Sequence, residues 1–221
     1  MPKARGRRAA PPRGRRGRPS GSGWLWGGGF VVALIVLALL ARVGARPAPQ
    51  LLQQAHALGR QVFAVGDTQT GGQGQTVDGI ACDQGANTHY HYHTHLSLFY
   101  DGKQIAVPMG VGIAQPQPTP GTGWVDQGSC LYWLHTHDAS GIIHIESPTI
   151  GPFTLGDFFA IWGEPLSRHD VAGYHGTVYA YVDGKPYSGG LQSIALQSHE
   201  EITLAVGRAV TPPTYTWPNG L

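Results

Sequence analysis

Residues 89–100 have the sequence HYHYHTHLSLFY, which places a histidine at every second position from His89 to His95. Side chains alternate between the two faces of an extended strand, so all four imidazoles project from one face at intervals of about 7 Å. This pattern predicts a strand that holds metal ions on one face. Two other interpretations stay open: a solvated strand rich in histidine, and a pH-sensing cluster, because imidazole titrates near pH 6.5. The opposite face, which can pack against a core, carries Leu96, Leu98 and Tyr100.

A second histidine cluster lies in the segment CLYWLHTHDASGIIHIES, residues 130–147. The stretch Asp138–Gly141, between two apolar runs, predicts a turn and therefore a hairpin. In the simplest register His135 faces His144, because a shift by one residue would separate the isoleucines from the face that carries Leu134. The polar face of this hairpin then carries Trp133, His135, His137, Ile142, His144 and Glu146.

The two clusters together suggest a set of metal ligands. Facing residues of an antiparallel pair have Cβ atoms about 5 Å apart. A His-x-His pair with a third histidine across the hairpin can therefore supply three of the four ligands of a tetrahedral site. The expected ligands are His135, His137 and His144 in a central site, His93 and His95 closing that site, and His89 and His91 in an outer site.

Two acidic residues lie close to these histidines in the sequence. Asp138 and Glu146 are expected to accept hydrogen bonds from the ligands or to act as a general base. Asp138 has a second interpretation as a turn residue, and Glu146 as the exposed end of a strand. The remaining histidines of the domain are expected at the surface, with ligation by either of the first two as the alternative: His169, His175 and His199.

Cys82 and Cys130 precede the two histidine segments by seven and five residues. Outside the cytoplasm, such a pair predicts a disulfide that ties the two segments together, although ligation of a metal by cysteine is the alternative. With both thiols in a disulfide, imidazoles remain the main donors. They suit copper or zinc first, with iron or nickel also compatible.

The first 46 residues differ in composition from the rest of the chain. Residues 1–23 contain eight basic and no acidic residues, which predicts a disordered cytoplasmic tail. Residues 24–41 carry no charge and are just long enough to span a bilayer, in contact with lipid. The positive-inside rule then places the chain after Arg46 outside the cytoplasm. The prediction is a single-pass protein of the cell membrane with a linker and short helix over 42–60; a signal peptide cleaved near Val43–Ala45 is the alternative.

Beyond Arg46 the sign of the charge reverses. Five basic and thirteen acidic residues give this part a net charge of −8 with histidine neutral. Such a domain suits cations and argues against nucleic acid as a partner. The expected partners are a metal ion and a metal-handling protein of the periplasm or cell surface.

Short alternating segments predict a mainly β domain over residues 61–211, followed by an irregular tail at 212–221. Asp-Gly-Lys turns indicate hairpins over 96–108 and from Thr177 onward. Two short strands are expected on either side of Ser198–Glu201.

One helix is expected after Thr154, which can cap the segment LGDFFAIWG with Asp157 in its first turn. The predicted fold class is therefore a β-sandwich or small barrel with one short helix, preceded by a single N-terminal transmembrane helix.

Three resemblances accompany these motifs. The HxHxHxHL strand with the WLHTHDASGIIHIE hairpin resembles uncharacterised bacterial membrane-anchored proteins, which implies a tethered domain but supplies no activity. The string Leu134–His137 followed by Gly141 is similar to the His-Thr-His copper motif of ascorbate-dependent copper monooxygenases. The three-histidine geometry is similar to the zinc site of alpha-type carbonic anhydrases, for whose fold the chain is too short.

Three classes of function are compatible with the sequence. The favoured one is a membrane-anchored extracytoplasmic domain that binds copper or zinc for acquisition, buffering or delivery. The second is a three-histidine metalloenzyme, either a copper oxidase or oxygenase or a zinc hydrolase. The third is a structural or pH-responsive domain without metal. No nucleophile motif, phosphate-binding loop or Cys-x-x-Cys is present.

Overall fold

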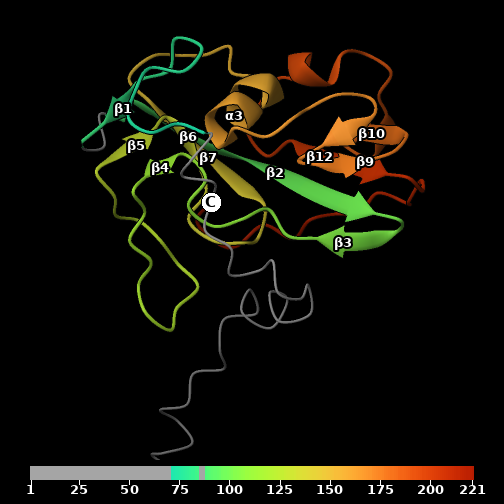
Figure 1. Cartoon of the computed structure of the whole chain (residues 1–221), viewed down its shortest axis with the longest axis horizontal. Coiled ribbons are helices and arrows are strands. Elements are labelled where there is room, and N and C mark those ends of the chain that lie inside the picture. The colour runs from blue at the N-terminus through green and yellow to red at the C-terminus, as the bar shows by residue number, and fades with distance from the viewer. Residues whose placement is uncertain (1–70, 85–87) are drawn as a thin grey trace, which may run out of the picture. The chain divides into compact units, whose positions relative to one another are not determined.

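The computed structural model describes residues 71–84 and 88–221, which form a mainly β fold with one α-helix (Figure 1). In chain order its strands are β1 Cys82–Asp83, β2 Tyr90–Tyr100, β3 Lys103–Ile105, β4 Ile113–Ala114, β5 Cys130–Tyr132, β6 Leu134–His135, β7 Ile142–Ser147, β8 Asp170–Val171, β9 Tyr174–His175, β10 Val178–Val182, β11 Lys185–Pro186 and β12 Glu201–Val206. The expectations for residues 1–60, including the membrane span, lie outside the described residues. Within the described part, no helix is long and apolar enough to cross a membrane.

A seven-stranded mixed sheet forms the centre of the domain. Its strand order is β11-β10-β12-β2-β7-β6, and β3 pairs with β2 beside this path. Strands β12 and β2 run parallel, whereas the other pairs in this sheet are antiparallel. The histidine-bearing strand β2 is therefore an interior strand, held by β12 along its second half and by β7 along its first.

Both Asp-Gly-Lys turns form hairpins as the sequence predicts. In the first, Tyr100 pairs with Lys103 across Asp101 and Gly102, which have φ angles of 49° and 79°. In the second, Val182 pairs with Lys185 across a turn of the same kind. Positive φ at both central positions gives the turn a twist that matches the twist of the flanking strands.

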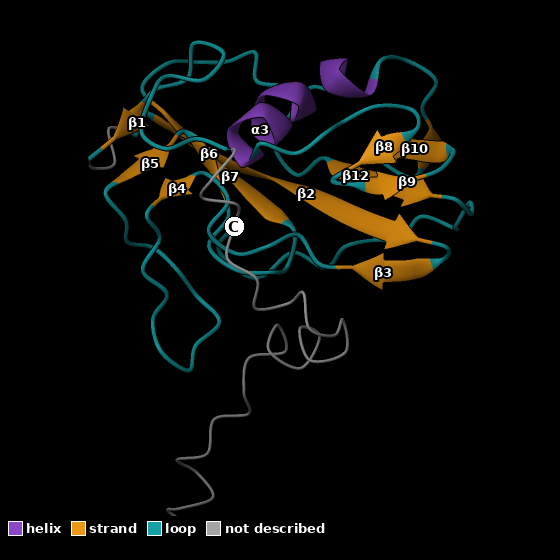
Figure 2. Ribbon diagram, viewed as in Figure 1, coloured by secondary structure: helices purple, strands orange, loops and turns teal. Residues whose placement is uncertain are grey.

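The helix α3, Leu155–Trp162, lies against one face of the central sheet (Figure 2). Thr154 is its N-cap: its hydroxyl accepts a hydrogen bond from the Asp157 backbone NH, and the Asp157 carboxylate accepts one from the Thr154 backbone NH. This reciprocal pair satisfies two NH groups that the first turn leaves without partners. Gly163 ends the helix with a φ of 82°, a conformation that costs glycine little.

The core fills the space between α3 and the sheet. Leu96 and Leu98 of β2 are buried there with Ile143 and Ile145 of β7, as the alternation predicts. Tyr100, at the end of β2, is an exception because 39% of its surface is exposed. The histidines of β2 and β7 consequently project from the face of the sheet that is turned away from α3.

The disulfide between Cys82 and Cys130 is present, as predicted. It joins two strands of a small sheet with the order β1-β5-β4, in which Cys82 lies opposite Tyr132. Cys130 begins β5, and only Trp133 separates the end of β5 from β6, so the bridge fixes the approach to the histidine hairpin.

Removal of this bridge should destabilise the domain. Replacing both cysteines with alanine is expected to lower the free energy of unfolding by about 4 kcal/mol, because the crosslink closes a loop of roughly fifty residues. Denaturant titration of the wild type and the double variant measures this difference. A reductant should shift the wild-type midpoint and leave the variant unchanged; equal midpoints without reductant would refute the prediction.

The structure also corrects three expectations. The central sheet has two different end strands, β11 and β6, so the described residues form no closed barrel. The helix lies on a sheet face where a sandwich would need a second large sheet, and the fold is therefore best described as mixed β-sheets with one helix. Of the two strands expected around Ser198–Glu201, only β12 forms; the preceding residues include a short 3-10 helix, Leu191–Ser193.

Candidate metal centre

The candidate site is built on three neighbouring strands, β2, β7 and β6. His93 lies directly opposite His144, and His144 lies directly opposite His135. Because neighbouring strands are about 4.8 Å apart, the three imidazoles stand side by side on one face of the sheet. The register predicted for the hairpin, with His135 facing His144, is thus confirmed.

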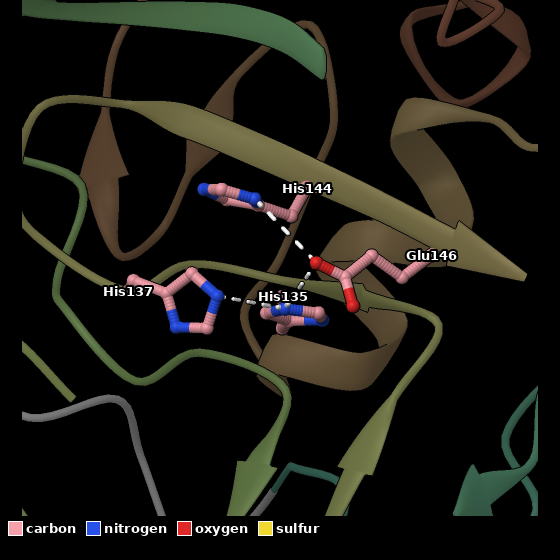
Figure 3. A group of neighbouring side chains, drawn as sticks. All are labelled: His135, His137, His144 and Glu146. Atoms are coloured by element: carbon pink, nitrogen blue, oxygen red, sulfur yellow. Dashed lines mark hydrogen bonds and ion pairs between the residues drawn. The ribbon is translucent and has the colours of Figure 1, made fainter. Parts of the chain in front are cut away.

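Two members of this row converge with two further side chains, and all four are drawn in Figure 3. Each offers a ligand atom within 4.8 Å of those of the other three: His135, His137, His144 and Glu146. Nε2 of His135 lies 3.3 Å from Nε2 of His137. The Glu146 carboxylate oxygen Oε1 lies 3.9 Å from His135 Nε2 and 3.8 Å from His144 Nδ1. Three imidazoles and one carboxylate are a typical ligand set for a transition-metal ion.

Backbone carbonyls fix the protonation of two of these rings. The Nδ1 of His135 lies 2.8 Å from the carbonyl oxygen of Tyr132, and the Nδ1 of His137 lies 2.6 Å from that of Val125. A carbonyl oxygen only accepts hydrogen bonds, so each Nδ1 must carry the proton and donate it. When both rings are neutral, each Nε2 therefore presents a lone pair, and the two lone pairs face each other.

This contact cannot be a hydrogen bond between neutral rings, because neither Nε2 has a proton to donate. A cation between the two nitrogens would make the arrangement favourable. With metal–nitrogen bonds of about 2.0–2.1 Å and tetrahedral angles, two ligand nitrogens are separated by about 3.3 Å. The observed 3.3 Å equals this separation.

Burial disfavours protonation of three imidazoles, those of His135, His93 and His144. It lowers the pKa of His135 to about 3, with a smaller contribution from the neighbouring His137. It lowers the pKa of His93 to about 4, assisted by His91, and holds the pKa of His144 well below its usual range, assisted by His135. Lone pairs on these rings are consequently available to a metal ion at neutral pH.

A second group shares His144 with the first. His91, His93 and His144 offer ligand atoms within 4.8 Å of one another. Nε2 of His93 lies 3.1 Å from Nδ1 of His144, and Nε2 of His91 lies 3.3 Å from Oε1 of Glu146. The His91 side chain is half exposed, so this group connects the buried group with solvent.

The structure places the other predicted site residues away from both groups. His95 is buried, but its Nε2 donates to the Ser140 carbonyl oxygen and its ring stacks on Tyr215 at 3.6 Å. His89, just before β2, is exposed. Asp138 accepts hydrogen bonds from the backbone NH and hydroxyl of Ser140, which makes it a turn residue of the β6–β7 connection.

The turn also holds the hairpin against β2. Gly141 has a φ of 90°, and its carbonyl oxygen accepts a hydrogen bond from the Leu96 NH. A Cβ at this position would collide with the Leu96 carbonyl oxygen. Glycine therefore permits the close approach that brings β7 and its histidine beside β2.

The loop before β5 contributes to the site in a way that its sequence does not indicate. Trp124 stacks on the His137 ring at 4.6 Å, and Val125 exchanges hydrogen bonds with His137 through both its NH and its carbonyl. These contacts orient His137, which follows the end of β6. The only sequence signal for them is a tryptophan within a segment otherwise rich in proline and glycine.

A pocket of about 450 Å³ opens beside the first group. His135, His137 and Glu146 line it together with Trp133 and Asp83. The indole NH of Trp133 donates to the Asp83 carboxylate at 2.8 Å, which fixes this wall. The group is thus accessible to small molecules from one side.

The three remaining histidines lie at the surface, as expected. His169 is exposed, and His175 pairs with Asp170 in the β8–β9 hairpin. His199 is exposed and donates from Nε2 to the Leu221 carbonyl oxygen. None of them belongs to either group among the described residues.

Comparison with known proteins gives no relative from which a function could be transferred: no family model, curated protein or solved structure matches the chain. The class that fold and site define is a mainly β domain with a buried histidine–glutamate group able to hold a metal ion.

Proposed function

We propose that this chain is a membrane-anchored extracytoplasmic protein that binds a transition-metal ion through a multi-histidine site. The observation that carries the proposal is the pair of Nε2 lone pairs of His135 and His137, which face each other at 3.3 Å. The fold holds the two nitrogens at this separation, and a contact between two neutral rings in these tautomers becomes favourable when a cation lies between them. His144 and Glu146 supply two further donors to the same ion.

Donor chemistry supports copper or zinc as the ion. Imidazole is a preferred ligand of both metals, and a single carboxylate is compatible with either. The cysteines are joined in the disulfide and so offer no thiolate. Iron and nickel also accept this donor set, and metal availability decides among the four in the cell.

Acquisition, buffering or delivery of the ion is the role that the surroundings support best. The His91–His93 group reaches the surface and shares His144 with the buried group. An ion can therefore exchange between solvent and the buried ligands through overlapping sets of donors. The net charge of −8 beyond Arg46 favours the approach of cations, and we propose a metal-handling protein as partner.

Metal analysis of the full chain tests the proposal. The protein should be purified in detergent without a histidine tag or nickel column and analysed for copper, zinc, iron and nickel. We expect at least about 0.5 equivalents of one metal as isolated, or one equivalent after reconstitution and desalting. Protein that retains none of the four metals after reconstitution would disprove the proposed function.

The anchor is supported by the sequence of the first 46 residues. The uncharged stretch 24–41 follows a tail with eight basic residues, which predicts an N-terminus in the cytoplasm. Protease added to right-side-out spheroplasts should therefore digest the domain, while a cytoplasmic marker protein stays intact. Digestion only after lysis would place the domain inside and overturn this orientation.

A metalloenzyme is the second candidate, and the pocket beside the metal group favours it. A catalytic metal needs three protein ligands and a position open to water or substrate. Three histidines can serve as ligands, and Glu146 can then accept a proton from a metal-bound water. Zinc hydrolysis or copper-dependent oxidation are the reactions that such a site supports.

A further inference from the structure

The pocket meets the metal group from one side. His135, His137 and Glu146 line it, whereas His144 is not among the described lining residues. The two facing Nε2 atoms belong to lining residues, so an ion held between them would border the pocket. A molecule in the pocket could therefore reach a coordination position of the ion.

The charge of the pocket is negative. Asp83 and Asp126 line it in addition to Glu146, and the described lining residues include no lysine or arginine. The Asp83 carboxylate cannot swing away freely, because the Trp133 indole NH binds it. A divalent ion with these three carboxylates has a local net charge of about −1, so the ion does not make the pocket attractive to anions.

We infer that this pocket admits a small uncharged donor, such as a neutral imidazole group, to the metal ion as a ligand additional to the four side chains, and that it disfavours small anions. The inference rests on the proposed function, because it requires a bound ion. It specifies the class of ligand or substrate for that site. Phosphates, carboxylates and halides are then poor ligands, although they are common ligands of positively charged metal centres.

The expected size of this discrimination follows from Coulomb's law. A carboxylate several ångströms from the ligand, in partly screened surroundings, changes the dissociation constant of an anion by about 3- to 10-fold. Asp126 is exposed and contributes at the lower end of this range, whereas Asp83 is partly buried. The dissociation constant of an uncharged ligand depends very little on either carboxylate.

Titration of the copper-loaded full chain with two probes tests the inference. Imidazole at pH 8 is the uncharged probe and azide the anionic probe, and both are read from the visible absorption and electron paramagnetic resonance of Cu(II). We expect imidazole to shift the spectrum saturably while copper remains bound after desalting. Azide should bind at least about 10-fold more weakly.

Variants that replace the carboxylates of Asp83 and Asp126 test whether the charge of the pocket causes this difference. D83N keeps an oxygen that can accept from Trp133, and D83N/D126N should strengthen azide binding by about 10-fold while changing imidazole binding less than about 2-fold. D101N, in the β2–β3 turn outside the described pocket lining, should change neither.

The outcomes separate the two proposals. Protein that holds no metal contradicts the proposed function and this inference together. If the protein holds copper, two results with imidazole would contradict the inference alone: no change in the spectrum, or loss of the copper. Two results with azide would also contradict it: binding as tight as that of imidazole, or binding that D83N/D126N leaves unchanged.

Discussion

Replacing His137 with alanine is expected to lower the affinity for Cu(II) or Zn(II) by more than about 100-fold. Structural metal sites with four ligands bind with about 10–16 kcal/mol, so one ligand contributes about 3 kcal/mol or more. The ring lies beside the end of β6, and its Nδ1 donates to a loop carbonyl. Its removal should therefore leave the fold intact. Calorimetric titration of the full chain measures the affinity.

His175→Ala is the matched control, because His175 is exposed, forms an ion pair with Asp170 and belongs to neither candidate metal group. It should bind metal like the wild type. The triple variant H135A/H137A/H144A should show no tight binding. If the triple variant bound metal as tightly as the wild type, the site would lie on other strands.

The second large effect concerns acid. Between pH 6.5 and about 4, the metal-free protein is expected to lose several kcal/mol of unfolding free energy. Burial lowers the pKa of His135 to about 3 and of His95 to about 4, whereas both titrate near 6.5 when unfolded. The unfolded state therefore binds more protons in this range, and stability falls as the pH falls. Denaturant titration at several pH values measures the slope.

The variant H95Q removes one of these two titrating side chains. His95 lies outside both candidate metal groups, and a glutamine can still donate to the Ser140 carbonyl oxygen. In this range the pH slope should decrease by up to about 1.4 kcal/mol per pH unit, whatever the absolute stability of the variant. Equal slopes for H95Q and the wild type would show that His95 is not held neutral by burial.

Local pattern predicted the elements that hold the candidate site. The alternation in β2, the turn at Asp138–Gly141 and the Thr154 cap each depend on neighbouring residues, and the structure contains all three. The hairpin register followed from keeping the isoleucines on one face. The prediction of the disulfide followed from the compartment expected from the sequence and from the presence of only two cysteines.

The features of the site that the sequence did not predict depend on contacts between residues far apart in the chain. The period of β2 places four histidines on one face but does not say which neighbours each will meet. The strand β12 returns parallel to β2 beside His95, and the tail stacks Tyr215 on that ring, which removes it from the metal group. The role of Val125 likewise depends on how a loop folds back onto His137. No local periodicity carries this information.

X-ray absorption spectroscopy of the metal-loaded full chain tests the central claim most directly, because it reports the ligands of the ion itself. We predict nitrogen or oxygen neighbours at about 2.0–2.1 Å and outer scattering from at least two, and up to three, imidazole rings. In H137A the imidazole scattering should decrease by one ring. A first shell of oxygen without imidazole scattering, or a spectrum that H137A leaves unchanged, would contradict the assignment of the metal to His135, His137 and His144.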